Sequence, residues 1–215
     1  MTSEGPEPTS LREQRRRQLE LLSETHLLDA AERVFAAKGY AGATMKEIAE
    51  AAEFSVGALY NFFPGKEGLF AAVMSRRNVE FTVIFAEALA GEAPARTRLR
   101  KMVDVICDYY LEQREFMRLF QQAIGRVWLN IKASFNEENY RQYEEVMAME
   151  AAVFRAGIAS GEMRDGDPDM MAAVFAGAVQ AYLARRILDE GASGDEAASR
   201  KALVELVERA FLRRP

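Results

Sequence analysis

The segment TMKEIAEAAEFSVGALYNFFPGK at residues 44–66 constrains the fold of this chain more than any other stretch. Thr44, followed by a glutamate three residues later, can form a capping box and predicts a short helix that ends near Ala52. After a tight turn, Ser55 can cap a second short helix at residues 56–62. Two short helices around a tight turn are typical of a helix-turn-helix, whose second helix enters the major groove of DNA.

The two short helices each have an inner and an outer face. Leu59 and Phe63 are four residues apart and are expected to point into a core, as is Ile48 in the first helix. The outward positions of the second helix are then Val56, Gly57, Ala58, Asn61 and Phe62. A glycine in a helix costs roughly 1 kcal/mol relative to alanine. A close approach of the helix backbone to phosphates and base edges would explain why Gly57 stands here. The alternative is an ordinary helical hairpin that packs through small residues.

The order and spacing of these residues closely resemble the signature of the TetR (tetracycline repressor) family. The shared pattern is T-x-x-x-I-A-x-x-A from Thr44, followed by S-x-G-x-L-Y-x-F-F-x-x-K-E-x-L-F from Ser55. Two residues depart from it. Glu53 stands where the turn glycine is usual, so the turn is expected to be wound differently or to hold a strained residue. Phe62 stands where a histidine or tyrosine is common, which removes a possible polar contact to DNA.

The resemblance implies an all-α fold of about nine helices, with an amino-terminal three-helix DNA-binding bundle and a carboxyl-terminal helical domain. The expected order is a disordered arm at 1–12, a helix-turn-helix DNA-binding domain at 13–65, a connecting helix at 66–89 and an effector-binding and dimerisation domain at 90–215. The residues expected at the DNA are Thr44, Lys46, Ser55, Val56, Gly57, Ala58, Tyr60, Asn61, Phe62 and Lys66. Of these, the resemblance assigns Thr44, Tyr60 and Lys66 to phosphates.

The rest of the chain has helical periodicity, with no alternating strand pattern and no internal repeat. Further helices are expected at about residues 14–37, 66–89, 95–112, 114–124, 137–160, 168–189 and 195–212. The first of them carries a stripe of Leu19, Leu22, His26, Ala30, Val34 and Ala37, and Gly39 is expected to stop it.

Charge does not by itself indicate nucleic acid. The chain has a net charge of −5, and residues 10–66 hold eight basic and eight acidic side chains. A non-specific polyanion binder is therefore not expected. A local cluster at Arg12, Arg15, Arg16 and Arg17 could still touch phosphate, and a solvated helix end is the alternative. Cys107, the single cysteine, suits a reducing cytoplasm and a buried thiol, and no apolar run approaches the roughly 20 residues of a membrane span.

The stretch MMAAVFAGAVQAYLARRI at residues 170–187 is apolar nearly all round, so it must be covered on more than one side. A partner subunit is the expected cover, and a helix buried within one chain is the alternative. The resemblance implies a homodimer through the last two helices, with the interface residues Val174, Phe175, Ala178, Tyr182, Leu206 and Phe211. Two reading helices one DNA turn apart, roughly 34 Å, predict a palindromic operator.

Aromatic and methionine side chains are dense between residues 109 and 154, beyond what a small helical core needs. Such density with a few polar groups is typical of a site for a small, largely apolar molecule. The residues expected to bind this effector are Tyr109, Tyr110, Met117, Phe120, Gln121, Trp128, Tyr143 and Met147. Core packing is the alternative for most of them, and Trp128 is the best candidate.

Catalytic motifs are missing from the sequence. His26 is the only histidine, and no phosphate-binding loop, nucleophile elbow or CxxC is present. We therefore expect no enzyme, no metal site and no cofactor. The expected function is a one-component transcriptional regulator, a repressor released from its operator by a small-molecule effector. A helical carrier of small molecules with a non-functional helix-turn-helix is the alternative.

Overall fold

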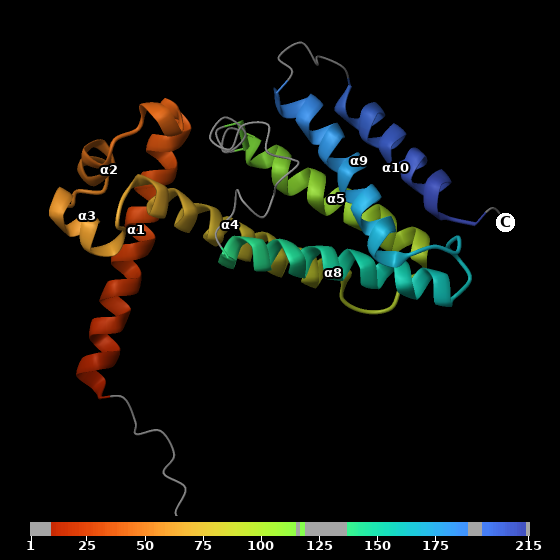
Figure 1. The fold of residues 1–215 in the computed structure, drawn as a ribbon, viewed down its shortest axis with the longest axis horizontal. Helices are drawn as coiled ribbons and strands as arrows, with labels where there is room; N and C mark the ends of the chain where they lie inside the picture. Colours follow the sequence, from red (N-terminus) through yellow and green to blue (C-terminus); the bar gives the residue numbers. More distant parts are fainter. Residues whose placement is uncertain (1–9, 115–116, 119–136, 189–194, 214–215) are drawn as a thin grey trace, which may run out of the picture. The chain divides into compact units, whose positions relative to one another are not determined.

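The structure is a computed structural model that describes residues 10–114, 117–118, 137–188 and 195–213. The described part contains eight helices and no strand, which confirms the all-α prediction (Figure 1). They are α1 (Leu11–Gly42), α2 (Met45–Ala51), α3 (Val56–Phe62), α4 (Lys66–Leu89), α5 (Ala95–Glu112), α8 (Glu137–Ala159), α9 (Pro168–Leu188) and α10 (Glu196–Phe211). The helix expected at 114–124 lies largely outside the described residues. The chain divides into two compact units, an amino-terminal unit up to Val73 and a carboxyl-terminal unit from Met74.

Helix α1 begins earlier than the sequence indicated. Ser10 caps it in a capping box with Glu13, so residues 10–12 of the predicted disordered arm belong to a helix and its cap. Gly39 interrupts the helical geometry with a φ of 74°, as the predicted stop. Of the six residues in the predicted stripe only Ala30 is buried, while His26 and Ala37 are exposed, as are Leu19 and Leu22 in the first turns. In Figure 1 these first turns extend beyond α2 and α3, and a helical period cannot show which part of a long helix has neighbours.

The core of the amino-terminal unit holds α2 and α3 against the second half of α1. Ile48 and Leu59 are fully buried, as predicted, and Phe63 is nearly so. The first turns of α4 close this core through Phe70, whose ring lies 5.4 Å from that of Phe35 and 5.0 Å from that of Tyr40. The two short helices are therefore fixed on one side by contacts within their own unit.

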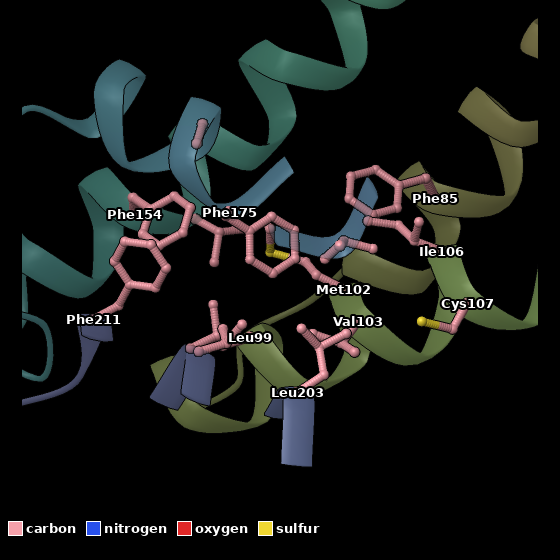
Figure 2. Close-up of a cluster of buried hydrophobic side chains, with 14 of the residues drawn as sticks. Phe85, Leu99, Met102, Val103, Ile106, Cys107, Phe154, Phe175, Leu203 and Phe211 are labelled. Carbon is pink, nitrogen blue, oxygen red and sulfur yellow. The ribbon is translucent and has the colours of Figure 1, made fainter. Parts of the chain in front are cut away.

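The carboxyl-terminal unit contains the remainder of α4 together with α5, α8, α9 and α10. Figure 2 shows its apolar core, where Phe154 of α8 lies between Phe175 of α9 and Phe211 of α10. Cys107 is fully buried in the same core, and burial raises the pKa of its thiol to about 12. The predicted burial of this thiol is therefore confirmed.

Polar contacts fasten the ends of these helices. The Glu208 carboxylate of α10 pairs with Arg96 and Arg100 of α5. The backbone after α10 pairs with the loop between α8 and α9, where the Arg164 N–H donates to the Phe211 carbonyl at 2.9 Å. These contacts fix α10 along the unit without covering its outer face.

The turn between α2 and α3 contains the only non-glycine residue with positive φ in the described part of the chain. Glu53 has a φ of 58°, in the left-handed region. A side chain with a Cβ atom costs about 1–2 kcal/mol in this region, whereas glycine adopts it freely. The sequence expectation of a strained residue at this position is confirmed.

We expect Glu53→Gly to raise the free energy of unfolding by up to about 1 kcal/mol, because relief of the strain exceeds the added entropy of the unfolded chain. The matched control is Ala36→Gly at an exposed position of α1, which should lower the free energy of unfolding by about 1 kcal/mol. Urea denaturation of both variants measures the difference. A loss of stability in Glu53→Gly equal to that of the control would show that the turn carries no strain.

Candidate nucleic-acid interface

The outer face of α3 is open to solvent. The Ser55 hydroxyl caps the helix by accepting a hydrogen bond from the Ala58 N–H at 3.1 Å. With Leu59 turned inward, the side chain of Tyr60 is 50% exposed and that of Val56 is 38% exposed. Gly57 and Asn61 are also exposed, whereas Ala58 and Phe62 are half-buried. The outward face predicted from the sequence is therefore present, although Phe62 contributes only part of its ring.

Gly57 has no packing role within the described chain. A Cβ atom built on it would meet no other atom within 4 Å. The alternative of a hairpin that packs through small residues therefore does not explain this glycine. The space beside Gly57 is open to solvent.

The hydroxyl of Thr44 already has partners in its own helix. Its Oγ1 accepts a hydrogen bond from the Glu47 N–H at 3.2 Å and donates to Glu47 Oε2 at 2.9 Å. Lys38 binds the other oxygen of this carboxylate at 2.7 Å, and the hydrogen bonds from Lys38 and Thr44 lower the pKa of Glu47. Lys46 is freer, because its ammonium lies 3.8 Å from Glu50 at an exposed position.

Lys66 has an internal role that the sequence analysis did not anticipate. Its ammonium donates to the carbonyls of Tyr40 at 2.8 Å and Ala43 at 3.0 Å, and lies within 3.4 Å of that of Ala41. The same ammonium lies 4.7 Å from the centroid of the Tyr40 ring. These bonds tie the start of α4 to the end of α1. A lysine in the first turn of a helix opposes the helix dipole, and this was the available signal of such a partner.

The first turns of α1 carry the basic cluster. Arg12, Arg15, Arg16 and Arg17 are all exposed, and Arg16 forms only a surface pair with Glu20 at 3.5 Å. Such a pair contributes little to stability. These cations are therefore accessible to a polyanion.

The predicted effector residues lie at different depths. Tyr109 is buried, and its hydroxyl donates to the Arg77 carbonyl at 3.0 Å or to Glu80 at 3.2 Å, so it is satisfied by α4. Burial and the Glu80 charge raise the pKa of Tyr109. Met117, Tyr110, Tyr143 and Met147 are half-buried. Phe120, Gln121 and Trp128 lie outside the described residues.

One residue of this region was missed by the sequence analysis. Glu150 of α8 is 2% exposed, and its Oε2 atom has no hydrogen-bond partner in the described part of the chain. The signal was present in the sequence, because the positions three and four residues away on both sides are apolar: Val146, Met147, Val153 and Phe154.

The predicted dimer residues divide into two groups. Val174 is 56% exposed and Leu206 is 61% exposed, while Ala178 and Tyr182 are half-buried. The prediction also placed Phe175 and Phe211 at the interface. Both are instead buried in the core of their own unit against Phe154. Helix α9 is apolar on every side, so its period alone could not separate the inward positions from the outward ones.

No metal site and no membrane span emerge from these residues. In the described ranges, no group of three or more histidine, cysteine, aspartate or glutamate side chains could hold a metal ion. His26 is exposed, with its ring 6.2 Å from that of Phe54. No helix in the same ranges is long and apolar enough to cross a membrane.

The capped α2, the turn at Glu53 and the capped α3 together have the geometry of a helix-turn-helix. Residues 27–73 match the family described as "Bacterial regulatory proteins, tetR family". This match runs from the second half of α1 to the first turns of α4, and it agrees with the TetR resemblance in the sequence.

Named relatives share parts of the chain. The HTH-type transcriptional repressor NicS of Pseudomonas putida is 28% identical over 141 residues, which cover 65% of each chain. The HTH-type transcriptional activator FasR of Mycolicibacterium smegmatis is 36% identical over 93 residues, which cover 43% of this chain and 42% of FasR. The chain therefore covers less than two thirds of either relative.

A solved structure shares the fold over most of the chain. The fatty acid degradation regulator FadR from Bacillus halodurans superposes with a TM-score of 0.72 at 16% identity, over 86% of this chain and 93% of that one. At this identity the likeness describes the fold alone.

We expect Gly57→Ala to stabilise the protein and weaken its binding to DNA. Alanine gains up to about 1 kcal/mol of helix propensity and meets open space within the protein, but its methyl group would stand between α3 and a bound duplex. Thermal denaturation and a DNA titration of the same variant measure the two effects. A stabilised variant with unchanged DNA affinity would exclude close approach at Gly57.

Proposed function

We propose that this protein is a one-component transcriptional regulator that binds a palindromic operator as a homodimer and is released by a small-molecule effector. The observation that carries the proposal is the free outer face of α3, with Gly57 facing open space while Leu59 is fully buried. Such a face fits a DNA groove and has no use in the packing of its own unit. A regulator of this kind acts in the cytoplasm, where its operator lies.

The reading surface is proposed to comprise Ser55, Val56 and Asn61 of the α3 region, with Tyr60 at a phosphate. Asn61 is the one exposed amide of α3 and can read adenine through its N6 and N7 atoms. Thr44, Lys46 and the arginine cluster of α1 are proposed to contact phosphates. A phosphate contact from Lys66 would have to replace one of its carbonyl bonds.

We propose repression as the mode of action, since a dimer bound across a promoter excludes the polymerase. NicS is named a repressor and FasR an activator, so a reporter assay is needed to distinguish repression from activation. The carrier alternative drew its support from Glu53 in place of glycine and from the zero net charge of residues 10–66. The turn closes through a left-handed Glu53, which preserves the two-helix geometry and removes the first of these supports.

The dimer is proposed to form through the outer faces of α9 and α10. The exposed side of α9 carries Met170, Val174 and Gly177, and α10 contributes Leu206. Large apolar side chains on one exposed face are typical of a protein interface. A symmetric pair would present two α3 helices to successive major grooves, roughly 34 Å apart.

Effector release requires that the effector binds the DNA-incompetent arrangement of the dimer more tightly than the competent one. A coupling of about 1–3 kcal/mol gives a 5- to 150-fold change in operator affinity. Helix α4 is the element through which we propose this coupling, because it is one unbroken helix that begins in the amino-terminal unit and ends in the other.

We expect footprinting of the DNA upstream of the gene to show a protected palindrome. Asn61→Ala should lower the free energy of discrimination between bases by about 1–3 kcal/mol at one position of each half-site, since it removes a base contact. Arg15→Ala is the control, because loss of a phosphate contact weakens binding to all sequences alike. If no sequence is protected, the regulator proposal fails.

We expect Val174→Arg to yield a monomer with at least about tenfold weaker operator binding, because an unpaired charge would be placed in an apolar interface. Val83→Arg is the matched control, since Val83 is 51% exposed on α4 and lies outside the proposed interface. Sedimentation velocity measures the mass of both variants. If the Val174→Arg protein is still a dimer, the interface does not include Val174 and lies elsewhere.

A further inference from the structure

We propose that Glu150 is the polar anchor of the effector site and that the effector carries a cationic amine on an apolar body. This inference rests on the proposed function, because it assumes that the carboxyl-terminal unit binds a small molecule. It adds a residue that was not among the predicted effector contacts, and it specifies the chemical class of the ligand.

The buried carboxyl of Glu150 destabilises the folded protein as long as its Oε2 atom lacks a hydrogen-bond partner. It is 2% exposed, and its Oε2 atom has no hydrogen-bond partner in the described part of the protein. A buried polar atom without a partner costs about 1–3 kcal/mol, and native proteins rarely retain one without a function. A ligand that donates a hydrogen bond to Oε2 would remove this cost.

The surroundings of Glu150 are aromatic and apolar. Burial and, to a smaller extent, the Glu150 charge raise the pKa of Tyr110 of α5 and of Tyr143, which lies seven residues before Glu150 on α8. The Tyr110 ring in turn packs 5.2 Å from Phe81 of α4 and 5.3 Å from Tyr109. Aromatic faces attract cations, and they also pack against the apolar part of a ligand.

A second unsatisfied atom on the same helix also requires a donor. Gln142 is 4% exposed, and its Nε2 atom already donates to Ser75 at 3.0 Å and to Glu138 at 3.1 Å. Its Oε1 atom has no partner in the described residues. Gln142 precedes Glu150 by about two helical turns, roughly 12 Å along α8. Both unmet atoms can accept hydrogen bonds, so the complementary ligand is a donor.

The charge state of Glu150 fits a site that is stable when empty and selective when filled. Burial raises the pKa of its carboxyl to about 8, so the group is largely protonated at neutral pH and the empty site holds no unpaired charge. An incoming ammonium stabilises the carboxylate, and the carboxyl proton passes to solvent. A carboxylate ligand would gain less, because it could accept one hydrogen bond from the protonated carboxyl but would bring no opposite charge, and it would be repelled by the ionised form.

A purely structural role for Glu150 predicts a different response to mutation. If the carboxyl holds the core together, Glu150→Met should lower the melting temperature. If it serves a ligand, Glu150→Met should raise the melting temperature of the ligand-free protein, because an unsatisfied buried group is replaced by an apolar one of similar length.

The test uses the purified full chain and three probes with one alkyl chain: octylamine, octanol and octanoate. We expect calorimetry to show that octylamine binds at least about tenfold tighter than octanol or octanoate. Glu150→Gln should weaken octylamine binding by about tenfold or more and leave octanol within about twofold. Glu145→Gln, at an exposed position of the same helix, should change none of the three affinities.

The proposal is overturned if octanoate or octanol binds as tightly as octylamine, if Glu150→Gln leaves octylamine binding unchanged, or if no probe binds. A lower melting temperature for Glu150→Met also overturns it, in favour of the structural role. None of these measurements involves DNA. A failure of the regulator proposal, which footprinting detects, is therefore distinguishable from a failure of the amine proposal.

Discussion

The burial of one face of α3 is the constraint on which the amino-terminal unit depends. A helix of seven residues is too short to persist alone in water. Its structure therefore comes from Leu59, from the Ser55 cap and from the neighbouring Phe63, all of which act on one side or at the ends. Since the helix is held from within, its outer side is not needed for stability. This division is what allows the outer residues to be chosen for contact with another molecule.

The carboxyl-terminal unit also has a helix with one face in the core and another face exposed. Helix α9 buries Phe175 and Val179 against its own unit and leaves Val174 exposed, so one helix serves both a core and an apolar surface. Within the same unit, the Oε2 atom of the deeply buried Glu150 has no hydrogen-bond partner among the described residues. The proposed dimer partner would account for the exposed Val174, and the proposed effector would account for the unpartnered atom of Glu150.

The sequence predicted best where local chemistry determines structure. The Thr44 capping box, the Ser55 cap and the inward Leu59 follow from spacing within one or two turns, and the structure has all three. It predicted less where tertiary contacts decide. The apolar pattern of α9 could not place Phe175 in the core, and the internal bonds of Lys66 depend on a carbonyl 26 residues away. The missing partner of Glu150 is a property of the packed unit, which no motif encodes.

The glycine in α3 has a consequence for how this helix behaves before it meets a partner. A short helix with a glycine near its start lies at the low end of local stability, so its amide hydrogens should exchange with solvent ahead of those in α1 or α4. Contact with a duplex would then complete the ordering of the helix as it docks. Under the proposed function, α3 would acquire part of its rigidity from the duplex, and a mismatched site would be penalised by leaving that ordering incomplete.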